Sequence, residues 1–291
     1  MVSIKTLTIT NRARVIAALV EGNSVRATVR MTGAAKNTIV KLLAELGPAC
    51  AEYQDRAFRN LSCKRIQVDE IWSFIYAKQK NVTDEMREKQ IAGDVWTWVA
   101  MDADSKLVPS WLISDRSADA ATVLMRDLAS RLRYRVQLTT DGHKAYLSAV
   151  EDAFGQDIDY SMLIKMYGST EEGKYSPGEC IGCERKRIVG KPDPKYVSTS
   201  FVERQNLTMR MSMRRFTRLT NGFSKKAENH AAAVALFYMY YNFGRIHQTL
   251  RITPAMAAGV SDHVWDIEEI VALMPEKKAG LRGPYKKKIS D

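Results

Sequence analysis

Three acidic residues lie in segments whose surroundings are typical of a protein core. Asp69 lies within an apolar stretch, Asp141 closes another, and Glu203 stands near the start of a helix-like segment. Carboxylates are seldom buried unless they are paired or bind a metal ion. Three converging carboxylates suit Mg²⁺, with Mn²⁺ as a substitute, because these ions keep positions open for water and phosphate. The residues therefore predict a metal site for phosphodiester chemistry.

The residue types alone leave other interpretations of these acids open. Each of the three could instead form a structural salt bridge in the core. Glu70 and Asp102 lie in the same kind of apolar context, and either could replace one of the three. The choice depends on which elements bring the carboxylates together.

Alternating apolar and polar residues, many of them β-branched, predict four strands separated by turn signals. The predicted strands cover residues 64–72, 95–102, 107–114 and 136–141, and predicted helices cover residues 117–133 and 142–154. This order of elements favours an α/β fold in which helices cover a mixed sheet. If the first and fourth strands are neighbours, Asp69 and Asp141 meet near one edge. A helix packed across that edge would bring Glu203 to them.

The second half of the chain is irregular before it becomes helical. Residues 155–198 are rich in glycine, proline and charge, and we interpret them as a surface insertion whose first part could hold a strand. Long helices are predicted over residues 200–216 and 225–243. Pro254 is predicted to open a further helix.

The N-terminal residues predict a small helical domain. Helices are expected over residues 11–21, 24–30 and 35–46, with Gly47 and Pro48 ending the third. Two short helices joined by a glycine-containing turn are typical of a helix-turn-helix, whose second helix enters the major groove of DNA. The residues expected to contact DNA from that helix are Lys36, Asn37, Thr38 and Lys41. A helical bundle with no role in DNA binding is the alternative.

Three segments resemble the DDE transposases of bacterial insertion sequences, most closely those of the insertion-sequence-one family. They are VDEIWSF at residues 68–74, TTDGHKAY at residues 139–146 and the long segment at residues 201–230. The resemblance covers most of residues 10–265 and implies a ribonuclease H-like catalytic core. It further implies that Asp69, Asp141 and Glu203 are catalytic and bind divalent metal. Such an enzyme cuts DNA at the terminal repeats of a mobile element and joins the freed ends to a target.

A group of arginines follows the third acid. Many DDE enzymes carry a basic residue seven positions after the catalytic Glu, and in this chain that residue is Arg210. The arginines expected to contact the DNA backbone beside the catalytic helix are Arg204, Arg210, Arg214 and Arg215. A solvated helix face is the alternative. The chain departs from the compact family pattern because 62 positions separate Asp141 from Glu203, and the irregular residues 155–198 account for that length.

The charge distribution agrees with a polyanionic partner. The chain of 291 residues has 44 basic and 33 acidic residues, a net charge of +11. Residues 1–50 carry seven basic and two acidic residues, and residues 277–291 carry six basic residues and one acid. The excess therefore lies at the two ends, as in proteins whose ends contact nucleic acid. The last of these segments is expected to be a disordered tail.

The composition excludes several classes of protein. Four cysteines in 291 residues exclude a disulfide-stapled secreted scaffold. The longest apolar run is about half of a membrane span, and the N-terminus lacks the features of a signal peptide. We therefore expect a cytoplasmic protein with no membrane partner. Cys180 and Cys183 have metal-ligand spacing, but Cys50 and Cys63 are far apart in sequence, so free thiols are expected rather than a zinc site.

These observations together predict the organisation of the chain. The predicted parts are a helix-turn-helix domain (1–50), a connector (51–63), a ribonuclease H-like core (64–225), the C-terminal helical part of that core (226–276) and a basic tail (277–291). We expect a transposase that acts on double-stranded DNA as a homo-oligomer. The alternatives are a DNA-binding regulator or inactive relic without catalysis, and a simple nuclease that cuts DNA without joining ends.

Overall fold

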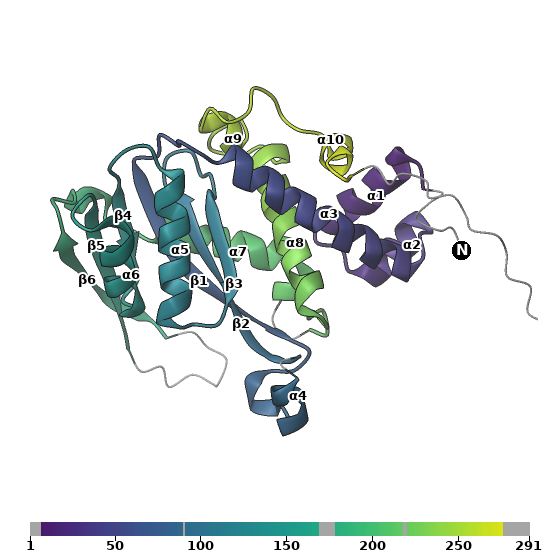
Figure 1. Cartoon of the computed structure of the whole chain (residues 1–291), viewed down its shortest axis with the longest axis horizontal. Helices are drawn as coiled ribbons and strands as arrows, with labels where there is room; N and C mark the ends of the chain where they lie inside the picture. Colours follow the sequence, from purple (N-terminus) through teal and green to yellow (C-terminus); the bar gives the residue numbers. More distant parts are fainter. Residues whose placement is uncertain (1–6, 90, 169–177, 218–219, 276–291) are drawn as a thin grey trace, which may run out of the picture.

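A six-stranded mixed sheet forms the centre of the protein (Figure 1). The computed structural model describes residues 7–89, 91–168, 178–217 and 220–275. The strands are β1 (Arg65–Ile75), β2 (Gly93–Asp102), β3 (Ser110–Ser114), β4 (Gln137–Thr140), β5 (Asp159–Tyr167) and β6 (Cys180–Val189). Their order in the sheet is β3-β2-β1-β4-β5-β6, in which β1-β4 and β4-β5 are parallel pairs and the other pairs are antiparallel. The predicted α/β fold with a mixed sheet is confirmed, and this sheet is compatible with a ribonuclease H-like core.

Helices cover both faces of the sheet (Figure 1). The helices after β1 are α4 (Asp84–Glu88), α5 (Ala118–Arg131), α6 (Ala145–Phe154), α7 (Ser200–Ser212), α8 (Ala227–Met239), α9 (Pro254–Ala257) and α10 (Ile267–Ala272), with a π-helical turn at Tyr240–Gly244. Val68 of β1 belongs to the apolar core that includes α5 and α6, whereas Ile71 belongs to the core that includes α7. Successive side chains of a strand point to opposite faces, so β1 serves both layers.

Three helices precede the sheet, namely α1 (Ile9–Val20), α2 (Val25–Thr32) and α3 (Lys36–Ala57). The hydroxyls of Thr8 and Ser24 cap α1 and α2 by accepting from backbone N–H groups three residues further on. Gly33 ends α2 with φ of +70°, the left-handed conformation that glycine adopts most readily. All three predicted helices are therefore present, and each starts within two residues of its expected position.

The third helix is longer than the sequence predicts. Gly47 and Pro48 are predicted to end it, whereas α3 continues to Ala57. Pro48 lies on the exposed side of the helix, where the carbonyl of the exposed Ala44 can bond to water instead of the missing N–H. The inward side of α3 packs along α8 on both sides of the proline. The predicted helix end is therefore wrong, and residues 51–57 belong to α3 rather than to a separate connector.

Gly47→Ala is expected to lower the free energy of unfolding by about 1–3 kcal/mol, the usual effect of overpacking a core. A Cβ at Gly47 would lie 2.5 Å from the Cβ of Ala232 and 2.7 Å from its carbonyl oxygen, so α3 and α8 would have to separate. Denaturant unfolding measures the change. The control is Ala44→Gly on the exposed side of α3, which should cost about 1 kcal/mol through helix propensity. A Gly47→Ala protein more stable than the wild type would contradict this close helix crossing.

The segment interpreted as a surface insertion, residues 155–198, contributes two strands to the sheet. The strand β5 pairs with β4, and β6 pairs with β5 at the sheet edge. The first half of β5 is buried, with Tyr160 and Met162 in the core, while most of β6 is exposed. Charged side chains are common on edge strands because they discourage pairing with another chain. The charged residues of this segment therefore belong in part to an edge strand, β6. The interpretation of residues 155–198 as a surface insertion is corrected.

The C-terminal half also differs in detail from the predicted helices. The helix predicted over residues 200–216 ends at Ser212 and is followed by a 3-10 turn at Arg214–Phe216. Pro254 opens α9 as predicted. No helix in the described parts of the chain is both long enough and apolar enough to cross a membrane. The predicted basic tail at residues 277–291 lies outside the described residues.

Candidate metal centre

Two of the predicted acids lie side by side in the sheet. The parallel pairing of β1 with β4 places Val68 opposite Thr140, so Asp69 and Asp141 follow at the same level, where β4 ends. Each of these acids, together with Glu70, offers an oxygen atom, and the three oxygens lie within 4.8 Å of one another. The predicted meeting of Asp69 and Asp141 is thus present in the structure.

The electrostatics of this pair favour a bound cation. Burial, and then the nearby Asp141 carboxylate, raise the pKa of Asp69 to about 6, although hydrogen bonds from the Glu70 backbone and Asn206 oppose the shift. A buried carboxylate beside a second carboxylate is disfavoured as an anion. A cation between them removes that penalty, which is why paired acids of this kind are candidates for metal ligands.

Helix α7 is docked onto β1 through two polar contacts. The side-chain oxygen of Gln67 accepts hydrogen bonds from the backbone N–H groups of Phe201 (2.9 Å) and Val202 (3.1 Å) in the first turn of α7. One turn further along, the Asn206 side-chain amide donates to Asp69 at 2.8 Å. Gln67 and Asp69 are two residues apart and share one face of β1. This docking places the first turn of α7, with Glu203, over that face.

The structure does not bring the Glu203 carboxylate into the group formed by Asp69, Glu70 and Asp141. One oxygen of Glu203 instead accepts from the Thr199 hydroxyl and pairs with the Lys165 ammonium group of β5. Glu203 still adds to the repulsion that raises the pKa of Asp69, after burial and Asp141, so it acts on the same site. Lys165 therefore balances the charge of the third predicted acid.

Glu70 lies close to Asp69 and Asp141, but its carboxylate already interacts with two other side chains. Its side chain is 1% exposed, and one oxygen accepts from the Tyr146 hydroxyl at 2.5 Å while the other pairs with Arg116 at 3.2 Å. Burial first, and then Asp141, raise the pKa of Glu70 to about 7. Because both oxygens have donors, Glu70 is better suited to anchoring Arg116 than to binding a metal.

The other alternative acid, Asp102, lies away from the pair. It ends β2 opposite Ile66, near the start of β1. One of its oxygens accepts from the backbone N–H and the hydroxyl of Ser105, which closes the turn after β2. Asp102 is therefore a turn residue, and it does not join the acidic group in the described structure.

Arg116 provides a fixed positive charge beside the acids. Its guanidinium group lies 3.2 Å from Glu70, 3.9 Å from Asp141 and 4.7 Å from the ring centroid of Trp96. The side chain is 40% exposed, so it faces solvent at the rim of the site. Sequence reasoning missed Arg116, Gln67 and Lys165. Only Gln67 had a readable signal, since it precedes Asp69 by two positions on the same strand.

The donor set fits a hard divalent cation. The side-chain oxygen of Asn206 is buried and has no hydrogen-bond partner among the described residues, while its amide nitrogen is held by Asp69. A buried oxygen without a donor is costly unless something positive satisfies it. Carboxylate and amide oxygens are the ligands that Mg²⁺ and Mn²⁺ prefer. The residues around Asp69 therefore fit such an ion.

Asn206→Ala is expected to weaken Mg²⁺ binding by about 10–100-fold, the usual effect of removing a group that orients a metal ligand. The variant loses the 2.8 Å hydrogen bond that fixes the Asp69 carboxylate. Titration calorimetry with Mg²⁺ measures the change, and Thr208→Ala, on a partly exposed position of the same helix, is the control. Unchanged Mg²⁺ affinity in Asn206→Ala would show that Asn206 serves only to dock α7.

The predicted DNA contacts of the N-terminal helices are placed unequally. Lys36, Asn37 and Lys41 are exposed in the first two turns of α3, and Lys41 forms a long ion pair with Glu45 at 3.9 Å. Thr38 is 8% exposed and faces the helical core instead. The structure therefore leaves three of the four predicted contacts open to solvent and removes Thr38 from that set.

The arginines after Glu203 also divide into two kinds. Arg204 and Arg214 are exposed, whereas Arg210 donates to the Phe216 carbonyl at 3.4 Å. The Arg215 guanidinium group turns inward and donates to Ser224 at 2.9 Å. Its burial lowers the pKa of Arg215 to about 10. Arg215 is thus a packing residue, which corrects its prediction as a backbone contact.

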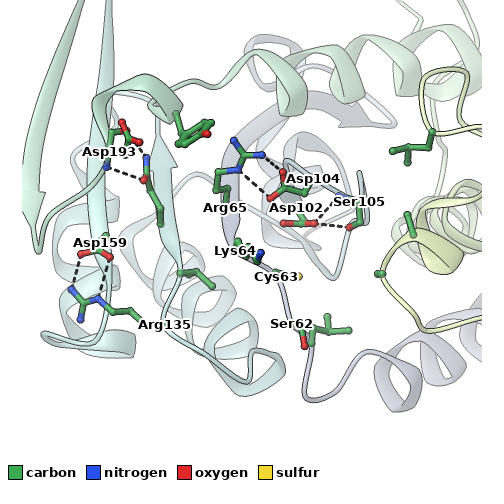
Figure 2. A pocket seen from close by; sticks show the side chains of 17 residues that line it. Ser62, Cys63, Lys64, Arg65, Asp102, Asp104, Ser105, Arg135, Asp159 and Asp193 are labelled. Carbon is green, nitrogen blue, oxygen red and sulfur yellow. Dashed lines mark hydrogen bonds and ion pairs between the residues drawn. The ribbon is translucent and has the colours of Figure 1, made fainter.

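A cavity of about 870 Å³ lies at the other end of the sheet, around the first residues of β1 and β4 (Figure 2). Figure 2 shows two ion pairs among its charged side chains. Arg65 pairs with Asp104, and Arg135 pairs with Asp159 at 2.8 Å. These two pairs occupy both arginines and two of the acids that line the cavity, so this cavity is a weaker candidate for chemistry than the acidic pair.

No known protein-family model matches the chain, and no curated protein matches it.

Proposed function

We propose that the chain is a DDE transposase of an insertion sequence, which binds the terminal repeats of the element and catalyses metal-dependent strand cleavage and strand transfer. The observation that carries the proposal is the meeting of Asp69 and Asp141 on neighbouring parallel strands, with α7 docked on Asp69 through Asn206. Two acids and a third on a docked helix are the pattern implied by the motif resemblance. A structural salt bridge explains Asp69 less well, because no basic side chain pairs with it among the described residues.

The sheet supports a ribonuclease H-like core for this enzyme. The first strand lies at the centre, between the antiparallel β2 and the parallel β4, and helices cover both faces. This arrangement puts the middle of β1 beside the end of β4, which is where the two proposed catalytic Asp residues lie. Strand ends in α/β sheets are common sites of ligand binding and catalysis.

In this proposal Asp69, Asp141 and Glu203 hold Mg²⁺, or Mn²⁺ in its place. The bound ion supplies activation of the attacking oxygen and stabilisation of the leaving oxygen in phosphodiester chemistry. The protein holds the proposed metal ligands in position. Asn206 orients Asp69, Gln67 fixes the first turn of α7, and Lys165 balances the charge of Glu203 in the metal-free protein.

Exposed basic residues support DNA as the partner. We assign recognition of the terminal repeats to α2 and α3 as a helix-turn-helix, with Lys36, Asn37 and Lys41 facing the DNA. Arg204 and Arg214 contact phosphates near the catalytic helix. Joining the two ends of one element requires two active sites, so the proposed working form is a homo-oligomer on DNA.

The test uses a duplex that carries the terminal repeats flanking the coding sequence, incubated with the full chain and Mg²⁺. The wild type should cut the duplex at the repeat and join the freed end to a second duplex. Asp141→Asn should bind the duplex with unchanged affinity but neither cut nor join it. The matched control is Asp152→Asn, since Asp152 is an acid on α6 that pairs with Arg126 away from the site.

Other outcomes of this experiment identify the alternatives. Binding without cleavage by the wild type indicates a regulator or an inactive relic. Cleavage without joining indicates a simple nuclease. Unchanged cleavage and joining by Asp141→Asn would show that the catalytic assignment is wrong.

A further inference from the structure

The edge strand β6 contains a β-bulge between its two cysteines. Cys180 pairs with Tyr167, Gly182 pairs with Met166, and Cys183 pairs with Lys165, so Ile181 is the extra residue of the bulge. In a regular strand, side chains three positions apart point to opposite faces. One extra residue changes this alternation. Because their partners on β5 are only two residues apart, the two cysteines share one face of the sheet.

The two thiols lie in contact and are accessible. Their sulfur atoms are 3.8 Å apart, and both residues are exposed. The Cys180 thiol also donates to the carbonyl oxygen of Gly182. The remaining cysteines, Cys50 and Cys63, are buried, and buried thiols in apolar surroundings are chemically inert. The four cysteines of the chain therefore include one accessible dithiol, formed by Cys180 and Cys183.

A zinc site explains this pair less well than thiol chemistry does. Structural zinc requires four ligands, and no group of three metal-ligating side chains that includes a cysteine occurs among the described residues. Two thiols in contact without further ligands are the starting point for an intrachain disulfide, whose sulfur atoms lie about 2.0 Å apart. Rotation of exposed side chains can provide that approach.

We propose that Cys180 and Cys183 are a reversible oxidation site, which a peroxide converts to an intrachain disulfide. The first thiolate attacks the O–O bond of hydrogen peroxide and becomes a sulfenic acid, and the displaced hydroxide takes up the proton that this thiol lost and leaves as water. The second thiolate then attacks the sulfenic sulfur, the S–S bond forms, and the displaced hydroxide takes up the proton of the second thiol and leaves as a second water. Two thiols are oxidised, one peroxide is reduced, and a dithiol reductant reverses the reaction.

The dithiol lies on β6, the strand next to β5, which carries Lys165. Cys183 is directly opposite Lys165 in the register, and the Lys165 ammonium group pairs with Glu203. The disulfide therefore forms beside the residue that balances the charge of Glu203. The oxidation itself does not depend on the proposed transposase activity, so the two can fail separately.

The experiment treats the full reduced chain with hydrogen peroxide, blocks the remaining thiols with an alkylating agent and maps the tryptic peptides by mass spectrometry. Both cysteines fall within one tryptic peptide, residues 175–185. The expected result is that this peptide escapes alkylation, loses about 2 Da on formation of the S–S bond and recovers both thiols after dithiothreitol. Cys180→Ser and Cys183→Ser should each abolish the loss of mass, and circular dichroism checks that both variants fold.

Three results would overturn the proposal. The peptide could keep two alkylatable thiols at peroxide concentrations that oxidise a free dithiol. The oxidised cysteines could be found only in disulfides between chains or in sulfinic and sulfonic acids. Stoichiometric Zn²⁺ bound by the purified chain and lost from both Ser variants would instead identify a metal site.

Discussion

An Asp69→Asn variant should lose more than about 100-fold in Mg²⁺-dependent strand cleavage, because groups that merely orient a ligand already contribute about 10–100-fold. The same variant should unfold at a higher temperature than the wild type in metal-free buffer at pH 8. Burial and the neighbouring Asp141 raise the pKa of Asp69 to about 6, so its ionised form opposes folding. Removing the charge removes that opposition. A loss of activity accompanied by a gain in stability is typical of a functional carboxylate.

The gain in stability should depend on pH in a defined direction. An unfolded Asp loses its proton near its ordinary pKa of about 3.9, whereas folded Asp69 keeps it until about pH 6. Between these values the folded state binds more protons, so the wild type loses stability as pH rises. The advantage of Asp69→Asn should therefore be absent below about pH 4, grow to about pH 6 and stay constant above.

Thermal unfolding at several pH values measures this profile, with Asp152→Asn as the control. Asp152 is exposed, and its hydrogen bond with Arg126 lowers its pKa, so its replacement should bring no gain at any pH. Normal cleavage by Asp69→Asn would exclude Asp69 as a metal ligand. Equal stability of variant and wild type across the pH range would contradict the repulsion between Asp69 and Asp141.

Trp98→Ala should lower the free energy of unfolding by about 3–5 kcal/mol, as expected for removing a large aromatic side chain from a core. Trp98 is fully buried, packs edge-to-face on Tyr146 at 5.5 Å, and donates its indole N–H to the carbonyl of Asp115 at 2.9 Å. The variant leaves both a cavity and an unpaired carbonyl. It also removes support from Tyr146, which holds Glu70 and thereby Arg116 at the site.

Denaturant unfolding followed by circular dichroism measures the Trp98 effect. Trp98→Phe keeps one buried aromatic ring but loses the hydrogen bond and part of the indole volume, so its loss should be smaller than that of Trp98→Ala. Val123→Ala, at a position of α5 that is 54% exposed, should stay within about 0.5 kcal/mol of the wild type. A loss below about 1 kcal/mol for Trp98→Ala would contradict the tightly packed layer between the sheet and α6.

Local chemistry made part of this structure predictable. The alternation in β1 and the acid that closes β4 predicted that Asp69 and Asp141 meet if the two strands are neighbours. The structure pairs these strands in parallel, with Val68 opposite Thr140, so the two acids follow at the same level. The predicted helix starts at residues 24 and 117 also agree with the structure, where the hydroxyls of Ser24 and Ser117 accept from backbone N–H groups within the first turn of the helix that follows. These features depend on residues that are close in sequence or on one strand pairing.

The features that the sequence did not predict depend on contacts between elements that are far apart along the chain. The continuation of α3 through Pro48 depends on packing against α8, which lies nearly two hundred positions away along the chain. The pairing of Glu203 with Lys165 depends on β5, whose position in the sheet was not predicted from its composition. Arg116 reaches Glu70 and Asp141 from the loop after β3. No local pattern reports contacts of this kind, because each partner lies in a different element.

In the proposed function, the unbroken length of α3 bears on where the DNA is cut. Its 22 residues span about 33 Å at 1.5 Å per residue, close to one turn of duplex DNA at about 34–36 Å. Its first turn carries the proposed recognition residues Lys36 and Asn37, while its second half is packed on α8 within the body that holds the acids. One continuous helix therefore connects the proposed recognition residues to the part of the protein that holds the acids. In the proposed function, the length of α3 sets the number of base pairs between the recognised repeat and the phosphodiester bond that is cleaved.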